Sequence, residues 1–327
     1  MNSLAEWFVS LVVIPTTIWI ALAVHYHVRR PWLRWVVSLV PLAVVGVSLG
    51  TLPLMPWALA VWFGLFSISL AWWFSLRPRS KGDWAEGMAV LPRAEIVGDK
   101  LCVRHVRNFS YSATGDPSPC YEERTYDLAK LSSLDFFLSH WSGPVMAHTL
   151  VSFGFDDGQF LCVSVEARRQ RWQSYSPLWG LFRSYPLMFV LGDERDILRL
   201  RTNIRRERVY MYRLRLPQAN LRRLFLDYIR RVEALAAQPA WYNSVTSNCT
   251  TNLFYQGHAN VPWWLKPGIL LNGFSARTMY RLGVLNDRLP FKELQARSAI
   301  RERALAAGDA ADFSQRIRAE SDSPLPH

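Results

Sequence analysis

Three apolar stretches near the N-terminus, at roughly 7–28, 35–52 and 57–76, constrain the fold of this 327-residue chain most. Each is close to the ~20 residues that a helix needs to cross a bilayer. The first and third contain no Asp, Glu, Lys or Arg, whereas prolines and glycines interrupt the second. A cleaved signal peptide fits poorly, because no basic leader precedes the first stretch and two more follow. Core helices of a soluble protein are the alternative, but we expect a transmembrane anchor of about three helices over residues 1–76.

The net charge of +12 can be explained in three ways. Nucleic-acid binding is one, but no nucleic-acid motif accompanies the charge, so we expect no nucleic-acid partner. Attraction to anionic lipid headgroups suits a chain tied to a membrane. A plain solvated face explains the charge equally well. We therefore expect membrane lipid or a lipid-linked molecule as the partner, and no motif indicates a protein partner.

The basic residues that flank the apolar stretches predict the topology. They fall on one side of the anchor: Arg29, Arg30 and Arg34 after the first stretch, and Arg77, Arg79 and Lys81 after the third. The loop between the second and third stretches, Gly50 to Pro56, has none. Because basic residues favour the cytoplasmic side, this pattern places the large C-terminal region in the cytoplasm.

Beyond the anchor, the sequence predicts one α+β domain. Residues 77–92 are a basic, Pro-containing linker, 93–308 form the domain, and 309–327 are polar and expected to be disordered. A strand pair is expected around Gly98-Asp99, where apolar and polar residues alternate. A strand at Arg208–Leu216 and an amphipathic helix at Gln218–Ala237 follow.

The clearest local signal is a β-hairpin with an Asp-Asp-Gly turn at 156–158. Two alternating runs flank this turn, and Gly158 suits the left-handed position. If Phe155 pairs with Gln159, then His148 lies opposite Glu166 on the less apolar face of the sheet. A His beside a carboxylate is what a general base and its orienting partner require.

Cys249 is the candidate nucleophile, because it follows a short polar run at the predicted start of a helix. The positive end of the backbone dipoles favours its reactive thiolate. Ser247 or Asn248 can cap that helix. The alternative is a buried structural Cys with a satisfied core His, as we expect for the buried thiols of Cys102 and Cys162. The spacing of Cys and His residues indicates no zinc site, and we expect no metal and no cofactor.

Two arginines, Arg168 and Arg169, follow closely after Glu166 in the sequence. Arg168 and Arg169 are candidates to bind a phosphate or carboxylate of a substrate, although a solvated strand end is the equal alternative. His105 and His140 are weaker site candidates, and His105 is expected at a strand edge.

Several motifs in the same order resemble a known family, the Lnb N-terminal periplasmic domain. They are His148-Thr-Leu-Val-Ser-Phe-Gly-Phe, Ser164-Val-Glu-Ala-Arg-Arg, Asp193-Glu-Arg-Asp and Tyr242-Asn-Ser-Val-Thr-Ser-Asn-Cys-Thr-Thr, and the resemblance runs from about Arg93 to Phe274. The family resembles permuted papain-like thiol enzymes, with an antiparallel sheet packed on helices. Its namesake is implicated in lipoprotein N-acyl transfer at the outer face of the bacterial inner membrane.

The resemblance implies Cys249 as nucleophile, His148 as base and Glu166 as third member, with Arg168 and Arg169 near the site. It also implies a multi-pass inner-membrane protein whose domain lies in the periplasm, against the charge pattern. We therefore expect a membrane-anchored acyltransferase or hydrolase for a lipid-linked or envelope substrate, working through an acyl-enzyme. A peptidoglycan or peptide amidase with the same residues is one alternative. A non-enzymatic membrane sensor or assembly factor is the other.

Overall fold

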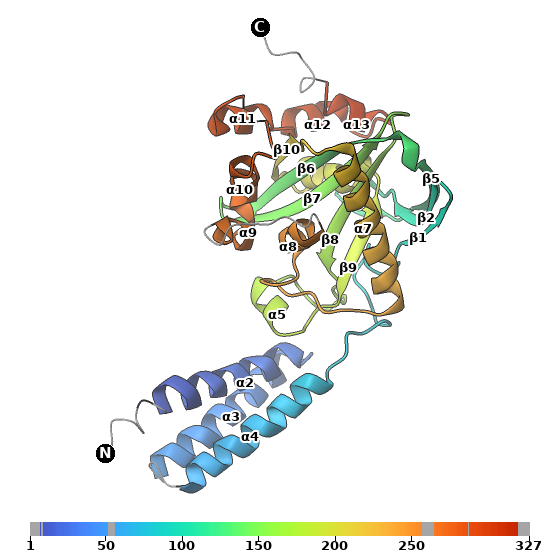
Figure 1. The fold of residues 1–327 in the computed structure, drawn as a ribbon. Coiled ribbons are helices and arrows are strands. Elements are labelled where there is room, and N and C mark those ends of the chain that lie inside the picture. The colour runs from blue at the N-terminus through green and yellow to red at the C-terminus, as the bar shows by residue number, and fades with distance from the viewer. Residues whose placement is uncertain (1–6, 8, 52–55, 257–264, 287, 320–327) are drawn as a thin grey trace.

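The chain folds into a helical bundle and an α+β domain, seen in a computed structural model that describes residues 7, 9–51, 56–256, 265–286 and 288–319 (Figure 1). The bundle contains a short π-helical turn and three α-helices: η1 (Val9–Val13), α2 (Ile14–His27), α3 (Pro31–Thr51) and α4 (Pro56–Ser75). These helices coincide with the three apolar stretches of the sequence.

Two bundle helices are long and apolar enough to cross a membrane by length and composition, within the described residues. Their apolar windows are Pro31–Ser48 and Trp57–Ser75, and only 17% and 6% of these windows are buried. The core helix of a soluble protein would bury most of its apolar surface. A third apolar helix, Leu11–His27, is shorter than a full span.

The domain is built on a mostly antiparallel sheet of eight strands, counted within the described chain. Its spatial order is β1-β2-β9-β8-β7-β6-β10, with β5 paired to β2. The strands are β1 (Arg93–Val97), β2 (Lys100–Arg107), β5 (Tyr121–Asp127), β6 (Leu131–Ser142), β7 (Met146–Phe155), β8 (Phe160–Ala167), β9 (Leu187–Gly192) and β10 (Arg208–Arg213). A separate two-stranded ribbon joins β3 (Ser110–Tyr111) to β4 (Pro117–Ser118).

Helices cover both faces of the sheet (Figure 1). One face packs on α7 (Gln218–Ala237) and α8 (Cys249–Gln256), with α10 (Ser275–Arg281) beside them. The other face packs on α6 (Glu194–Arg199), α12 (Arg301–Ala307) and α13 (Phe313–Arg316). Shorter elements complete the domain: η2 (Leu128–Lys130), α5 (Pro177–Leu181), η3 (Leu200–Ile204), α9 (Pro267–Leu270), η5 (Asn272–Phe274) and α11 (Phe291–Arg297).

The local predictions agree well with these elements. The strand pair around Gly98-Asp99 is β1–β2, with Val97 opposite Lys100. The amphipathic helix is α7, with the bounds expected from its sequence, and its apolar stripe is buried against the sheet. Proline prevents the helix from continuing at Pro239, and its C-cap is Gln238.

The prediction of a disordered tail was wrong for residues 309–319. Helix α13 lies there, and Phe313, Ile317 and Arg318 are buried. The Arg318 guanidinium lies 2.8 Å from Asp135 Oδ2 and 2.7 Å from Glu194 Oε1. A polar composition suggested solvent exposure, but these polar groups form a buried ion network. Residues 320–327 lie outside the described chain.

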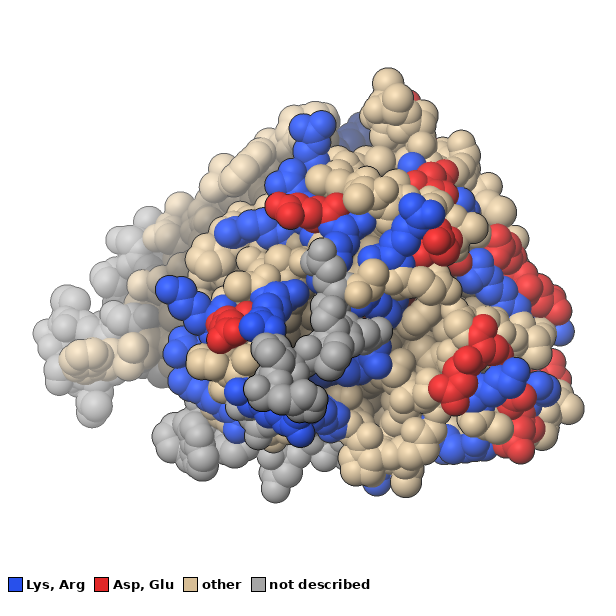
Figure 2. Space-filling model, turned by 90° about the horizontal axis from the view of Figure 1, so that it is seen from above, with Lys and Arg blue, Asp and Glu red and all other residues tan. Residues whose placement is uncertain are grey.

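The bundle contacts the domain at the end where α2 meets α3. Tyr26 lies 5.7 Å from Trp179 between ring centroids, and the Arg34 guanidinium lies 4.8 Å above the Trp179 ring. Arg183 donates to the Trp73 carbonyl oxygen at 2.6 Å near the end of α4. The face of the domain turned away from the bundle carries basic and acidic side chains interspersed, as a solvated surface does (Figure 2).

Candidate functional site

Cys249 is the first residue of α8, as the sequence predicts. The cap is Asn248, whose Oδ1 accepts from the backbone N–H groups of Thr250 at 2.9 Å and Thr251 at 2.8 Å. The cap fixes the helix start against strands β7 and β8, and the Cys249 side chain lies at this contact with only 5% of the residue exposed. A thiol in this position meets the positive end of the helix dipole.

The predicted hairpin brings His148 to Glu166. Strands β7 and β8 pair with Leu150 opposite Ser164 and Ser152 opposite Cys162, which confirms the expected register there. Successive side chains alternate between faces, so His148 of β7 and Glu166 of β8 share one face. His148 Nε2 lies 3.2 Å from Glu166 Oε1.

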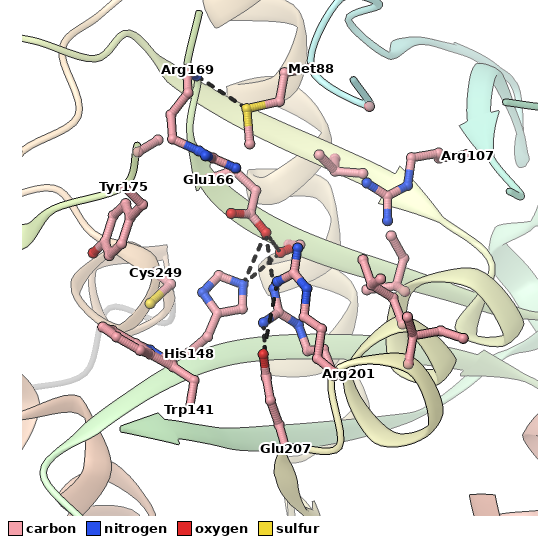
Figure 3. A pocket seen from close by; sticks show the side chains of 18 of the residues that line it. Met88, Arg107, Trp141, His148, Glu166, Arg169, Tyr175, Arg201, Glu207 and Cys249 are labelled. Carbon is pink, nitrogen blue, oxygen red and sulfur yellow. Dashed lines mark hydrogen bonds and ion pairs between the residues drawn. The ribbon is translucent and has the colours of Figure 1, made fainter. Parts of the chain in front are cut away.

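Ser164 joins the same pair of residues. Its Oγ lies 2.8 Å from His148 Nε2 and donates to Glu166 Oε1 at 2.6 Å. Figure 3 shows Cys249 on the side of the imidazole ring away from Glu166. The ring therefore has a carboxylate on one side and a thiol on the other, which is the arrangement of a base with its orienting group.

The charges of Cys249, His148 and Glu166 shift one another's pKa values: those of Cys249 and Glu166 are lowered and that of His148 is raised. Burial raises the pKa of the Cys249 thiol, but the His148 charge and hydrogen bond outweigh burial and lower this pKa to about 7. Burial and Arg201 lower the pKa of His148, while Glu166 and Cys249 together raise it to about 9. Burial raises the pKa of Glu166, but His148 and Arg201 hold it well below the ordinary value. Between pH 7 and 9, these values favour a thiolate beside an imidazolium.

Arg201, which the sequence reasoning missed, holds Glu166 from the other side. Its guanidinium lies 3.3 Å from Glu166 Oε1 and 3.3 Å from Glu207 Oε2, and only 7% of the residue is exposed. Arg201 comes from η3, which follows β9 and α6 in the chain. A buried cation between two carboxylates keeps both charged and limits the movement of Glu166.

Asn272 was also missed and lies next to the thiol. Its Nδ2 donates to Cys249 Sγ at 3.4 Å and to the Ala147 carbonyl oxygen at 3.3 Å. Its Oδ1 is buried without a hydrogen-bond partner among the described residues. The segment is held close to the β6–β7 turn, because Gly273 donates to Val145 O at 2.9 Å and a Cβ at Gly273 would collide with the Pro144 carbonyl.

These groups line one cavity of about 570 Å³. Aromatic side chains form the wall near Cys249, including Trp141 and Tyr175 (Figure 3), and Tyr242 also lines the cavity. Arg107, Arg169, Arg201 and Arg205 lie among the lining residues. The cavity thus offers an apolar wall and guanidinium groups to the same ligand.

The two candidate binding arginines, Arg168 and Arg169, lie in different surroundings. Arg169 lines the cavity, as expected for a substrate contact. Arg168 is 4% exposed and is absent from that lining. It donates to the carbonyls of Met88 at 2.9 Å and Ala89 at 2.8 Å, and its guanidinium lies 4.1 Å above the Trp84 ring. Adjacent residues of an extended chain point to opposite sides, so Arg168 secures the linker instead.

The remaining candidates lie elsewhere. His105 is an exposed residue at a β-bulge with a positive φ, and buried His140 does not line the cavity. Cys162 is buried, as predicted, whereas Cys102 is only partly buried, so its expected burial was overstated. No group of three His, Cys, Asp or Glu that could hold a metal occurs among the described residues.

Comparison with known proteins places the hairpin, Cys249 and part of the cavity lining within one family model. Residues 118–272 match the model of the Lnb N-terminal periplasmic domain, a shorter span than the resemblance in the sequence suggested. No curated protein and no solved structure matches the chain. The matched segment begins just before β5 and ends at Asn272, so it contains His148, Glu166, Arg201 and Cys249. Residues 118–272 of this chain are therefore similar to the Lnb N-terminal periplasmic domain, and the same chain contains two helices long and apolar enough to cross a membrane.

Proposed function

We propose that this protein is a membrane-anchored thiol enzyme that transfers or hydrolyses an acyl group. The observation that carries the proposal is the placement of Cys249 at the start of α8 beside the His148–Glu166 pair. The lowered pKa of Cys249 and the raised pKa of His148 support an activated nucleophile at neutral pH. The order of a sheet histidine before a helix cysteine supports a permuted papain-like relationship.

The Cys249 thiolate attacks the carbonyl carbon of an acyl ester, and the C–S bond forms as the carbonyl oxygen takes the negative charge. The tetrahedral intermediate collapses when the ester C–O bond breaks, and the His148 imidazolium gives its proton to the leaving oxygen. A thioester and a neutral imidazole remain. Water or an amine then attacks the thioester, His148 takes the proton of that nucleophile, and the thiolate leaves.

Two donors are placed to hold the developing oxyanion. Asn272 Nδ2 already lies 3.4 Å from Cys249 Sγ. The cap occupies the N–H groups of Thr250 and Thr251, so the Cys249 N–H is the remaining donor of the first helical turn that we assign to the oxyanion. A side-chain amide and the backbone N–H of the nucleophile together make up the oxyanion hole that we propose.

The bundle supports a lipid-linked substrate. We propose that α2, α3 and α4 all cross the membrane and that the domain lies on the periplasmic side of the inner membrane. The bundle contacts the domain through Trp179 and Arg183, which keeps the cavity near the bilayer surface. An acyl donor of the membrane, with lipoprotein N-acyl transfer as one version of the reaction, suits the apolar wall beside Cys249.

The test is to trap the acyl-enzyme. Full-length protein in neutral detergent is incubated with a phospholipid and its intact mass is measured. We expect a gain of one acyl chain that hydroxylamine removes, and no gain in Cys249→Ala or His148→Ala. Cleavage of cell-wall peptides without acylation by phospholipid would favour the amidase alternative. A Cys249→Ser chain that fully complements a deletion would favour the non-enzymatic one.

A further inference from the structure

A second hollow lies where the bundle meets the domain. It is lined by residues of the α2–α3 turn and by the chain around α5, namely Arg29, Arg30, Pro31, Arg34, Trp172, Ser174, Ser176 and Trp179. Its volume is about 720 Å³, and no Asp or Glu is among these residues. Arg29, Arg30 and Arg34 lie outside the matched family segment.

The three arginines have no carboxylate partner within the described chain. Arg29 and Arg30 are exposed at the end of α2. The Arg34 guanidinium donates to the Val28 carbonyl oxygen at 3.3 Å and lies over the Trp179 ring. Most other domain arginines near a hollow are paired, as Arg107 is with Asp196 at 2.7 Å. Three guanidinium groups without a counter-charge attract a polyvalent anion such as a phosphate.

The opposite wall offers neutral contacts to the same ligand. The indole rings of Trp172 and Trp179 lie 5.9 Å apart between centroids. The hydroxyls of Ser174 and Ser176 make no hydrogen bond in the part of the chain that the structure describes, so both are able to donate to a phosphate oxygen. Aromatic rings with a polar edge are the side chains that favour the bilayer interface.

The hollow lies at the end of the bundle where the apolar window of α3 begins. The apolar window of α3 begins at Pro31, directly after Arg29 and Arg30. Leu178 and Leu181 of α5 are 57% and 37% exposed beside this hollow, although both are apolar. Apolar side chains next to unpaired arginines suit a surface that touches acyl chains and phosphates at once.

The topology strengthens the case for a ligand. The basic turn contacts the domain through Arg34 and Trp179, so both lie on the same side of the membrane. The family is described as periplasmic, whereas the positive-inside tendency favours arginines on the cytoplasmic side. Arginines on the periplasmic side therefore do not serve topology and need another role.

We propose that this hollow binds the phosphate of an anionic phospholipid headgroup. Arg29, Arg30 and Arg34 bind the phosphate, while Trp172 and Trp179 pack against the glycerol. Ser174 and Ser176 flank Tyr175, which lines the cavity of Cys249, so one chain segment separates the two sites. The binding site stands on its own observations; use of the bound lipid as acyl donor rests on the proposed function.

The test measures lipid binding in full-length Cys249→Ala protein, which keeps the result independent of catalysis. The protein in neutral detergent is titrated with chain-labelled phosphatidylglycerol and, separately, with phosphatidylcholine carrying the same label. We expect saturable binding that favours phosphatidylglycerol, weakened about tenfold by Arg29→Gln with Arg30→Gln. Both arginines are exposed, so folding is preserved.

The matched control is Arg79→Gln with Lys81→Gln, which removes two exposed charges on the same side of the bundle but outside the hollow. Its affinity should stay within about twofold of the parent, since surface charge alone contributes little at moderate salt. Equal loss in both variants, or no saturable binding, overturns the proposal. A competition with glycerol phosphate distinguishes a lipid headgroup from a free phosphate compound as the ligand. Full displacement of the lipid by an equal concentration of glycerol phosphate would indicate a free-phosphate site and overturn the lipid assignment.

Discussion

Glu166 Oε1 lies 3.3 Å from Arg201 Nη2 and 3.2 Å from His148 Nε2, so one carboxylate oxygen is shared between two cations. This sharing holds Glu166 charged and keeps it from turning away from the imidazole. The charge state of Cys249 therefore depends on Arg201, which does not need to contact the sulfur.

Glu166→Gln should raise the pKa of Cys249. Without the carboxylate, the pKa of His148 falls from about 9 toward its ordinary value, and less positive charge remains to stabilise the thiolate. For a rise of one pKa unit, iodoacetamide alkylation of Cys249 at pH 7 should slow about fivefold, because the thiolate fraction falls from about one half to about one tenth. Glu86→Gln is the control, because Glu86 also lines the cavity but is exposed. Equal profiles in both variants would contradict this role for Glu166.

The rate of acyl-enzyme formation should follow a bell-shaped pH profile. It rises as pH passes about 7, where Cys249 loses its proton, and falls as pH passes about 9, where His148 loses the proton that the leaving group needs. The two values belong to the coupled pair. Single-turnover acylation from pH 5 to 11 measures the profile, and a rate that stays level above pH 10 would exclude His148 as the acid.

Asn272→Ala should separate acyl transfer from thiol reactivity. Loss of an oxyanion donor lowers the acylation rate about 100-fold. Alkylation by iodoacetamide forms no oxyanion, so its rate in the variant should stay within about threefold of the parent, since Cys249 keeps His148. Both rates are measured on the same preparation. An equal loss in the two reactions would mean that Asn272 only positions the cysteine.

Arg201→Met should unfold the domain at lower temperature. The substitution leaves the buried Glu207 and the partly buried Glu166 without their shared cation, which costs about 3–5 kcal/mol. Thermal unfolding in neutral detergent should show the loss. Arg223→Met is the control, because Arg223 is exposed on α7, and its midpoint should stay near that of the parent. A midpoint for Arg201→Met equal to the control would show that the network adds no stability.

Arg168→Gln should affect stability and Arg169→Gln should affect substrate binding, although the two residues are adjacent. The first removes donors to Met88 O and Ala89 O and should lower the unfolding temperature. The second changes a residue of the cavity lining and should raise the KM for an anionic substrate while stability stays unchanged. Thermal unfolding and steady-state kinetics on both variants decide this, and a stability loss with Arg169→Gln alone would reverse the assignment.

The hairpin that holds His148 and Glu166 could be predicted because alternation and a Gly turn act locally. Strands β6 and β9 could not be predicted from the sequence. Every residue of β9, Leu187–Gly192, is buried, so it has no polar face to produce alternation. Arg201 was missed because a π-helical turn after α6 brings it to Glu166, a placement set by tertiary packing. The separate roles of Arg168 and Arg169 likewise depend on where the linker packs.

Arg318 follows α13 in the chain and reaches the interior, where it pairs with Asp135 of β6 and Glu194 of α6. Asp135 and Glu194 are synthesised 183 and 124 residues before this cation, so Arg318 cannot neutralise them until that later segment has followed. A chain cut at residue 308 would leave Glu194 buried without its cation and Asp135 with Arg213 alone, and such truncated molecules should accumulate in a protease-sensitive form. Synthesis of the segment that carries Arg318 is thus coupled to protection of the domain from degradation.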